Sequence, residues 1–316
     1  MDGILLIDKP ADITSHDVVA RVRRILHERR VGHTGTLDPF ATGVLVILVG
    51  RATRLAQFLS GAEKEYQAVV RFGYSTDTGD LTGKPVSEIS EGAMRSSPLT
   101  WSELEIEAAL QSLRGEIDQV PPMYSAKKRD GRKLYELARR GETVERNSVR
   151  VRVYEFEALK CAGQFLKDNE DGTVDLAVRV VCSAGTYVRT LAEALGERLG
   201  VGAHLTELRR TRAGDFSIAS AVTLEQLKGK VDEEALATIL LQPDDALRSM
   251  PFVDLTEHDA QRVRRGIAIS LSQHSHGAAA QGDSVRMRDE AKRLVAVGCY
   301  DAATASFQPR VVVSIE

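Results

Sequence analysis

Residues 44–49, VLVILV, form an uninterrupted apolar run, and this run constrains the fold more than any other part of the chain. Six residues are the length of a β-strand and far too few to cross a bilayer, which takes about 20. A strand without polar side chains has both faces buried, so the run predicts a central strand covered on both sides.

The loop before this strand, GHTGTLDPFATG, presents a single carboxylate. Pro39 biases Asp38 toward extended geometry, and the glycines on both sides let the backbone bend and let a ligand approach. Asp-Pro also initiates ordinary turns. The residues alone therefore leave two interpretations, a simple turn or an acid displayed at the mouth of a rigid strand.

Elsewhere, helical and strand spacings are mixed, which predicts an α+β fold with a mixed central sheet. Strands are expected over 66–72 and 174–182. Capping residues and 3.6-residue spacing predict four helices: one from Thr14 to Leu26, one opened by Thr100 and Glu103 and closed by Gly115, a short one ending at Gly141, and one after Thr186.

The chain changes character near residue 249. PFVDL, RLVAVGCY and PRVVVSI are expected to be short strands, a helix is expected over 256–266, and residues 272–283 are polar. We therefore expect a larger domain over 1–248 and a small β-rich domain over 249–316. An acidic, helix-like stretch, 224–247, is the expected connector.

Positive charge is concentrated locally, although the 316-residue chain has a net charge of −3. Residues 120–152 contain ten basic and four acidic side chains, and arginines also cluster at 21–30 and 209–212. One such cluster would be read as a solvated helix face. Three clusters around one unusual loop favour a nucleic-acid partner.

Several other chemistries find little support. The three cysteines have no metal-ligand or disulfide spacing, and no export signal precedes the first strand, so a reducing cytoplasm is expected. Phosphate-binding and dinucleotide-binding glycine motifs are missing. Asp77 and Asp80 could pair as glycosidase carboxylates, but their glycine- and threonine-rich surroundings favour structural turns.

Six ordered segments of the chain resemble the TruB-type tRNA pseudouridine synthases. They are GILLIDKPADITSHDVV, VGHTGTLDPFATGVL, KEYQAVVRFGYSTDTGD, VPPMYSAKKRDGRKLYELARRG, CSAGTYVRTLAEALGERLG and GAHLTELRRT, and they span residues 3 to about 212. The resemblance implies a pseudouridine synthase-like catalytic domain and a PUA-like RNA-binding domain after Ser249. It also implies isomerisation of the T-loop uridine at tRNA position 55.

The resemblance implies three catalytic residues. Asp38 would be the central carboxylate, attacking the sugar C1′ or uracil C6, or removing a proton at C2′. Arg189 would pair with Asp38 and keep it ionised. Tyr66 would stack on the base and help to move the C5 proton, although its alternating strand also suits a core position. The isomerisation needs no redox change or group donor, so neither cofactor nor metal is expected.

The resemblance also implies residues that bind the substrate. Tyr187 would contact the flipped base, Leu208 would form an apolar wall, and Arg210 would lie near phosphate. His33 would fill the gap left by base flipping, and Lys9 would position phosphate or brace the loop. The alternative for each of these residues is a structural role, in the core, at the start of a helix or on the surface.

The expected partner is the T-stem-loop of tRNA, bound in part by Lys127 and Lys128, with no membrane association and a monomeric enzyme. The competing hypothesis from another class is a non-catalytic tRNA-binding or tRNA-folding protein.

Overall fold

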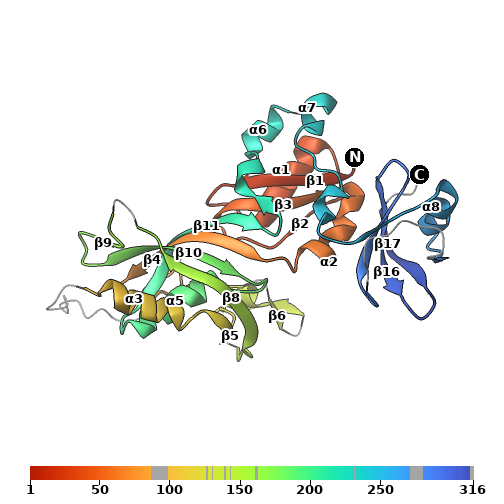
Figure 1. Ribbon diagram of the computed structural model, residues 1–316. Coiled ribbons are helices and arrows are strands. Elements are labelled where there is room, and N and C mark those ends of the chain that lie inside the picture. Colours follow the sequence, from red (N-terminus) through yellow and green to blue (C-terminus); the bar gives the residue numbers. More distant parts are fainter. Residues whose placement is uncertain are drawn as a thin grey trace.

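The computed structural model describes residues 1–86, 99–125, 127–129, 131–138, 140–142, 144–160, 163–230, 232–270 and 280–313. Its strands form a ten-stranded sheet, a five-stranded sheet and a two-stranded hairpin (Figure 1). Within these residues, no helix has the length and apolar character that crossing a bilayer requires.

The large sheet runs in the order β1-β3-β11-β4-β10-β8-β5, with β2, β9 and β12 pairing on β3, β10 and β11. All its pairings are antiparallel except β3 with β11, so the sheet is mixed, as predicted. Its strands are β1 (Gly3–Lys9), β2 (Val31–Thr34), β3 (Thr42–Val49), β4 (Lys64–Phe72), β5 (Gly115–Gln119), β8 (Val149–Ala158), β9 (Leu166–Asp168), β10 (Val174–Cys182), β11 (Ala203–Ala213) and β12 (Phe216–Ser217).

The apolar run occupies β3, between β1 and β11, and residues 43–49 are all buried. The prediction of a central, doubly covered strand is confirmed. One face packs against α1 (Ser15–Leu26), whose start is fixed by a capping box between Thr14 and Asp17. The other face packs against η1 (Gly50–Leu55), α2 (Ala56–Leu59) and part of the C-terminal sheet.

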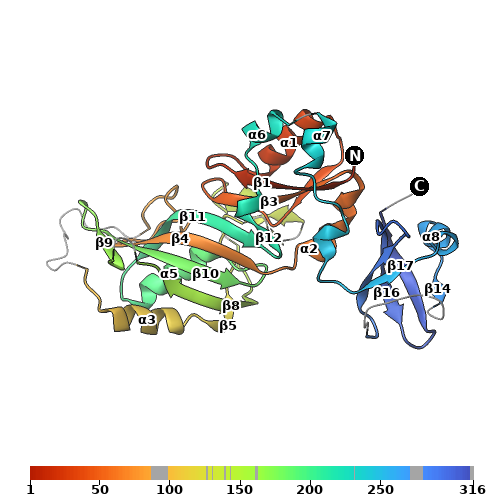
Figure 2. The same ribbon diagram turned by 45° about the horizontal axis from the view of Figure 1, so that its top comes forward.

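The alternating strand predicted at 66–72 is β4, and the strand predicted at 174–182 is β10. Their apolar faces form a core with α3 (Glu103–Gln111) and α5 (Val188–Arg198), which lie together on one side of the sheet (Figure 2). The predicted start of α3 was wrong. Ser102, not Thr100, is its N-cap, because Ser102 and Glu105 form the capping box.

The stretch 224–247 is not the continuous connector that we expected. It is broken into α6 (Leu224–Lys228), α7 (Glu233–Ala237) and η3 (Asp245–Leu247). Leu224, Leu227 and Leu236 are buried against α1 and β1, and the backbone of Leu241 pairs with Ile4. The stretch is therefore part of the main core, because its leucines cover the edge of β1.

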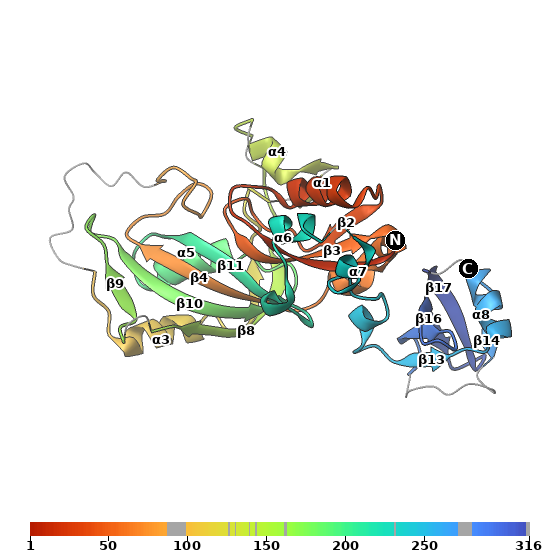
Figure 3. The ribbon, with the colours of Figure 1, turned by 90° about the horizontal axis from the view of Figure 1, so that it is seen from above.

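A short basic hairpin, β6 (Lys128–Arg129) and β7 (Arg132–Lys133), leads into α4 (Leu134–Ala138). Seen from above, α4 projects from the body on the same side as α1 (Figure 3). The predicted short helix thus exists, and Gly141 follows it with a positive φ of 74°. A further 3₁₀ turn, η2, spans Ile218–Ser220.

The C-terminal sheet runs β13-β15-β16-β17-β14 and packs on α8. The three predicted strands and the predicted helix are present, but β15 was missed because its alternating arginines hide its apolar positions. The polar stretch at 272–283 lies largely outside the described residues. The elements are β13 (Phe252–Asp254), α8 (Glu257–Arg264), β14 (Ile269–Ser270), β15 (Ser284–Arg288), β16 (Leu294–Asp301) and β17 (Ser306–Val312).

Candidate active site

The loop between β2 and β3 is held rigidly around Asp38. The hydroxyl of Ser15, at the start of α1, accepts a hydrogen bond from the Leu37 N–H at 2.9 Å and donates one to the Leu37 carbonyl at 3.1 Å. Ser15 is 1% exposed. The residue before Asp38 is therefore fixed by a buried, fully used hydroxyl.

Lys9, at the end of β1, braces the other side of Asp38. Its ammonium donates to the carbonyl oxygens of Pro39 (3.0 Å), Ile13 (2.7 Å) and Pro10 (2.8 Å). An ammonium has three N–H donors, so all are used, and the side chain is 0% exposed. The expectation that Lys9 binds substrate is wrong; it is a brace, the second of the two roles considered.

Asp38 and Arg189 come together although 151 positions separate them. Arg189 Nε lies 2.9 Å from Asp38 Oδ2, and its Nη2 donates to Oδ1 at 3.1 Å. The remaining guanidinium donors reach the carbonyls of Thr78 and Tyr124, both at 2.7 Å, and Asp80 Oδ2 at 3.7 Å. Arg189 is 3% exposed, so a fully partnered arginine fixes the carboxylate.

Asp80 was interpreted as a turn residue, and it is one. Its Oδ1 accepts hydrogen bonds from the Thr78 hydroxyl and from the backbone and hydroxyl of Thr82. Its Oδ2 also faces Arg189, so the turn contributes a second buried carboxylate to the site. Sequence spacing held no signal for this contact, because Arg189 lies on a distant helix.

Two opposing effects act on Asp38. Burial raises the pKa of its carboxyl, while the charge and hydrogen bonds of Arg189 oppose that rise. The side chain nevertheless keeps 32% of its surface exposed. It is thus open to a ligand on one side and bound to a cation on the other.

That exposed side faces a cavity of about 260 Å³. Tyr66 of β4, Leu208 of β11, and Tyr187 and Arg189 at the start of α5 line it together with Asp38. This volume is near the lower end of small-molecule sites, about 300 Å³, and suits one base better than a larger ligand. Burial raises the pKa of Tyr66, so its phenol is protonated at neutral pH.

The backbone of Tyr187 is held by Gln119, a residue that the sequence analysis missed. The Gln119 amide accepts from the Tyr187 N–H at 2.7 Å and donates to its carbonyl at 3.0 Å. Gln119 ends β5 and is 4% exposed. A lone glutamine carries no sequence signal for such a clamp.

Arg210 also lines this cavity, but it is buried there and bonded to the protein backbone, which does not fit the expected contact with phosphate. Its side chain is 1% exposed and donates to the carbonyls of Val44 at 2.8 Å and Gly35 at 2.9 Å. It therefore ties the loop and β3 to β11. Gly43 permits this approach, since a Cβ there would lie 2.2 Å from the Arg210 carbonyl oxygen.

Neither His33 nor Lys127 lines the cavity. His33 of β2 is half-buried and packs edge to face with His16, their ring centroids 5.5 Å apart. Burial lowers the pKa of His33 to about 4, so the ring is neutral. Lys127 is exposed just before β6, and the side chain of Lys128 lies outside what the structure describes.

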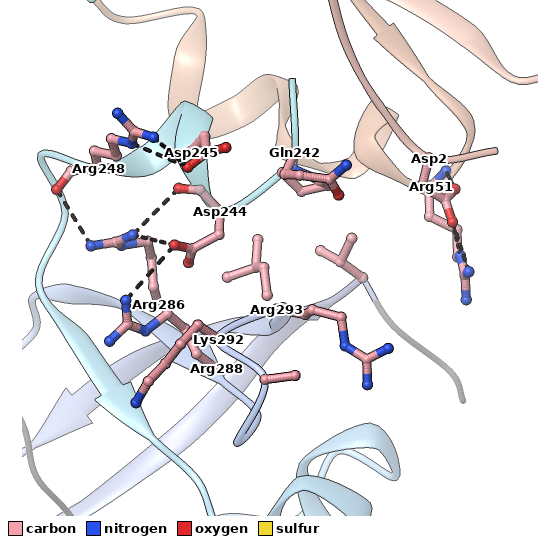
Figure 4. A pocket seen from close by; sticks show the side chains of 14 residues that line it. Asp2, Arg51, Gln242, Asp244, Asp245, Arg248, Arg286, Arg288, Lys292 and Arg293 are labelled. Carbon is pink, nitrogen blue, oxygen red and sulfur yellow. Dashed lines mark hydrogen bonds and ion pairs between the residues drawn. The ribbon is translucent and has the colours of Figure 1, made fainter. Parts of the chain in front are cut away.

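A larger cavity, of about 880 Å³, lies between η3 and the C-terminal sheet (Figure 4). Asp244 lies at its centre and pairs with Arg286 at 2.7 Å, while Arg288 pairs with Asp254 at 2.8 Å. The Asp244–Arg286 pair ties the C-terminal sheet to the start of η3, whereas the Arg288–Asp254 pair joins β15 to β13 within that sheet. Unlike the smaller Asp38 cavity, this one has no tyrosine or other aromatic side chain among the described residues that line it.

Comparison with known proteins gives two matching family models. "TruB family pseudouridylate synthase (N terminal domain)" matches residues 23–188, and "tRNA pseudouridylate synthase B C-terminal domain" matches residues 189–248.

Relatives described as tRNA pseudouridine synthase B cover most of the chain. The one from Geobacillus thermodenitrificans is 45% identical over 271 residues, 86% of each chain. The one from Burkholderia lata is 44% identical over 298 residues, 94% of this chain and 86% of the relative.

Two solved structures share the fold over 99% of this chain. An H/ACA RNP bound to a substrate RNA containing 2′-deoxyuridine has a TM-score of 0.72 at 26% identity, with 85% of that chain covered. A Cbf5-Nop10-Gar1 complex has a TM-score of 0.71 at 28% identity, with 84% covered.

Proposed function

The chain belongs to the TruB family of pseudouridylate synthases and isomerises uridine to pseudouridine in tRNA; we propose that its target is the T-loop uridine at position 55, with Asp38 as the catalytic carboxylate. The observation that carries the assignment to Asp38 is its bidentate pairing with the buried Arg189 at the edge of a base-sized cavity.

The reaction explains why one carboxylate is enough. The bond between N1 and C1′ breaks, the uracil turns, and C1′ is joined to C5, while C5 loses a proton and N1 gains one. Asp38 can serve as nucleophile at C1′ or C6, or as the base at C2′. Each role needs an ionised carboxylate, and Arg189 favours that form against the effect of burial.

Tyr66 and Leu208 form the two sides of the proposed base site. The ring of Tyr66 can stack on the uracil, and the buried Leu208 gives an apolar surface. Because burial raises the pKa of Tyr66, its phenol can relay a proton but does not start as a phenolate base. Tyr187 closes the cavity from the start of α5.

A cavity this small admits the uridine only after it leaves the RNA stack. We assign His33, whose neutral ring can replace a base in a stack, to the gap that remains. Lys127 and Lys128, at the projecting hairpin, are proposed to bind the T-stem-loop backbone. Among related structures, the H/ACA RNP with a substrate RNA supports RNA as the partner.

We divide the chain into a catalytic domain, 1–248, and a PUA-like RNA-binding domain, 249–316. The five-stranded sheet and its own apolar core support this division. The enzyme is proposed to be cytoplasmic and to act as a monomer. Sedimentation in the presence and absence of tRNA would test the monomeric state.

The proposed function is tested with the purified protein, without added cofactor or metal, and a T-arm stem-loop RNA carrying tritium at uridine C5. Wild-type protein should release tritium, and Asp38→Asn should lower the rate at least about 1,000-fold with RNA binding unchanged. Undiminished turnover by Asp38→Asn would overturn the assignment. Binding without turnover by the wild type would favour a tRNA-folding protein instead.

A further inference from the structure

Two lysines, Lys9 and Lys64, are buried at opposite sides of the Asp38 loop, 0% and 7% exposed. Burial lowers the pKa of each to about 8, so both remain largely charged at neutral pH. An ammonium has three N–H donors, and leaving one unused in a buried site is costly. The partners of each lysine therefore indicate what it does.

The two lysines differ in one respect. Lys9 uses all its donors on three backbone carbonyls and does not line the cavity. Lys64 donates to the carbonyls of Ser60, at 2.7 Å, and Ala62. Its third donor has no protein partner among the described residues, and Lys64 lines the cavity that contains Asp38.

Lys64 also lies beside the proposed base site. It precedes Tyr66 by two residues on β4, where side chains alternate, so both point to the same face of the sheet. Its Cε lies 3.7 Å from the position that a Cβ on Gly35 would take. The strand thus places the Lys64 side chain on the same face as Tyr66, the residue proposed to stack on the uracil, and both side chains line the cavity.

The surroundings of Lys64 add positive charge. Arg210 of β11 acts on its pKa in the same direction as burial, and Cys182 of β10 acts weakly against it. Burial raises the pKa of Cys182 to about 11, so that thiol is neutral. Within the described chain, Lys64 forms no ion pair with a carboxylate. This side of the cavity therefore favours a negatively charged oxygen.

The reaction supplies such an oxygen by every route open to Asp38. When N1 leaves C1′, its electron pair is shared with the carbonyl oxygens of the uracil. When a nucleophile adds to C6, the electrons pass through C5 to O4. In each case the charge disappears once C1′ is bonded to C5, any bond from Asp38 to C1′ or C6 has broken, the C5 proton has left and N1 is protonated.

We propose that Lys64 donates its third N–H to a carbonyl oxygen of the everted uracil and stabilises the negative charge that forms there during isomerisation. Lys64 keeps its proton throughout. The inference rests on the proposed function and adds a further catalytic side chain, opposite in charge to Asp38, to the same cavity.

The test compares Lys64→Met and Lys64→Arg with wild type in single-turnover tritium release from the T-arm RNA. Lys64→Met should lower the maximal rate about 100-fold, the cost of losing one donor to a developing oxyanion, with half-saturation changed less than threefold. Lys64→Arg should recover at least tenfold of that loss. Lys167→Met, at an exposed lysine on β9 with no proposed role, is the control and should leave both half-saturation and maximal rate unchanged.

The pH profile gives a readout that a structural role would not change. In wild type, kcat/KM should fall above pH about 8 as Lys64 loses its proton. In Lys64→Arg this fall should be smaller and lie at higher pH, because the guanidinium stays charged; the contribution of Lys9, whose pKa is also about 8, is the same in both proteins. If Lys64→Met fails to fold, the Lys64→Arg profile decides alone, and an unchanged alkaline limb overturns the proposal.

Two other outcomes would also overturn it. One is an unchanged maximal rate in folded Lys64→Met. The other is weaker RNA binding with no change in maximal rate. In that case the slope of log affinity against log salt concentration should fall by about 0.9, as expected for the loss of one phosphate contact. Activity in Asp38→Asn would instead refute the proposed function, whereas an inactive Asp38→Asn beside a fully active Lys64→Met refutes only this inference.

Discussion

Replacing Arg189 with methionine isolates the effect of its guanidinium on Asp38. The side chain keeps similar length, but Asp38 loses contacts at 2.9 and 3.1 Å, and Asp80 loses its nearest cation. Burial, which already raises the pKa of Asp38, then acts without the main opposing effect. A neighbouring opposite charge lowers a carboxyl pKa by about 1–3 units. Solvent screens part of this effect because Asp38 is 32% exposed, but the pKa of Asp38 should rise further in Arg189→Met.

The activity should follow that shift. The reaction needs ionised Asp38, so kcat/KM falls as the pH drops through its pKa, and in Arg189→Met this acidic limb should lie at higher pH than in wild type. Arg189→Lys is the matched control: it keeps the charge but has three donors in place of five. Its acidic limb should stay near that of wild type, while its maximal rate falls.

Stability gives an independent measurement with a defined sign. Losing one partner of a buried pair costs roughly 3 kcal/mol. A carboxyl whose folded pKa is raised binds more protons in the folded state, so its destabilising effect is complete above the folded pKa and fades as the pH falls toward the unfolded value. Arg189→Met should therefore lose most stability, by urea denaturation, at neutral pH and less in acid. The reasoning is refuted if both the acidic limb and the stability of Arg189→Met match those of wild type.

Two further predictions concern the scaffold and the RNA surface. Gly43→Ala should lower the free energy of unfolding by more than about 3 kcal/mol, because its Cβ would lie 2.2 Å from a β11 carbonyl oxygen at a φ of 105°. Gly131→Ala is the control: its φ is 80° but the space around it is open, so it should lose only about 1 kcal/mol. Equal losses in urea denaturation would contradict this prediction. Lys127→Ala should weaken tRNA binding and reduce the slope of log affinity against log salt concentration by about 0.9. Lys167→Ala, at an exposed lysine on β9, is the control and should leave both the affinity and the slope unchanged. Equal effects of the two variants in titrations at several salt concentrations would show that the hairpin is not the binding surface.

The strands could be predicted from the sequence because the spacing of their apolar residues indicates which faces are buried. The run 44–49 and the alternation in β4 each required a particular face to be covered, and the structure covers it. The stretch 224–247 was harder, because its few leucines serve three short elements that pack on β1. The spacing of apolar residues within this stretch does not indicate where its helices are interrupted.

The candidate site could be predicted only in part. Glycines and Pro39 marked the loop of Asp38, but only the family resemblance connected it to Arg189, which lies 151 positions away. Lys9 and Arg210 were misread because charged side chains are usually exposed. Both are buried here, since backbone carbonyls from distant segments accept their hydrogen bonds.

The most direct test is a structure of the protein with a T-arm stem-loop RNA. In that complex the position-55 uridine should leave the stack and enter the cavity, with its ring against Tyr66. A carboxylate oxygen of Asp38 should lie about 3–3.5 Å from a reacting atom of the nucleoside, C1′, C6 or the C2′ hydrogen. A uridine that remains stacked in the RNA, or an Asp38 carboxylate turned away from the bound nucleoside, would contradict it.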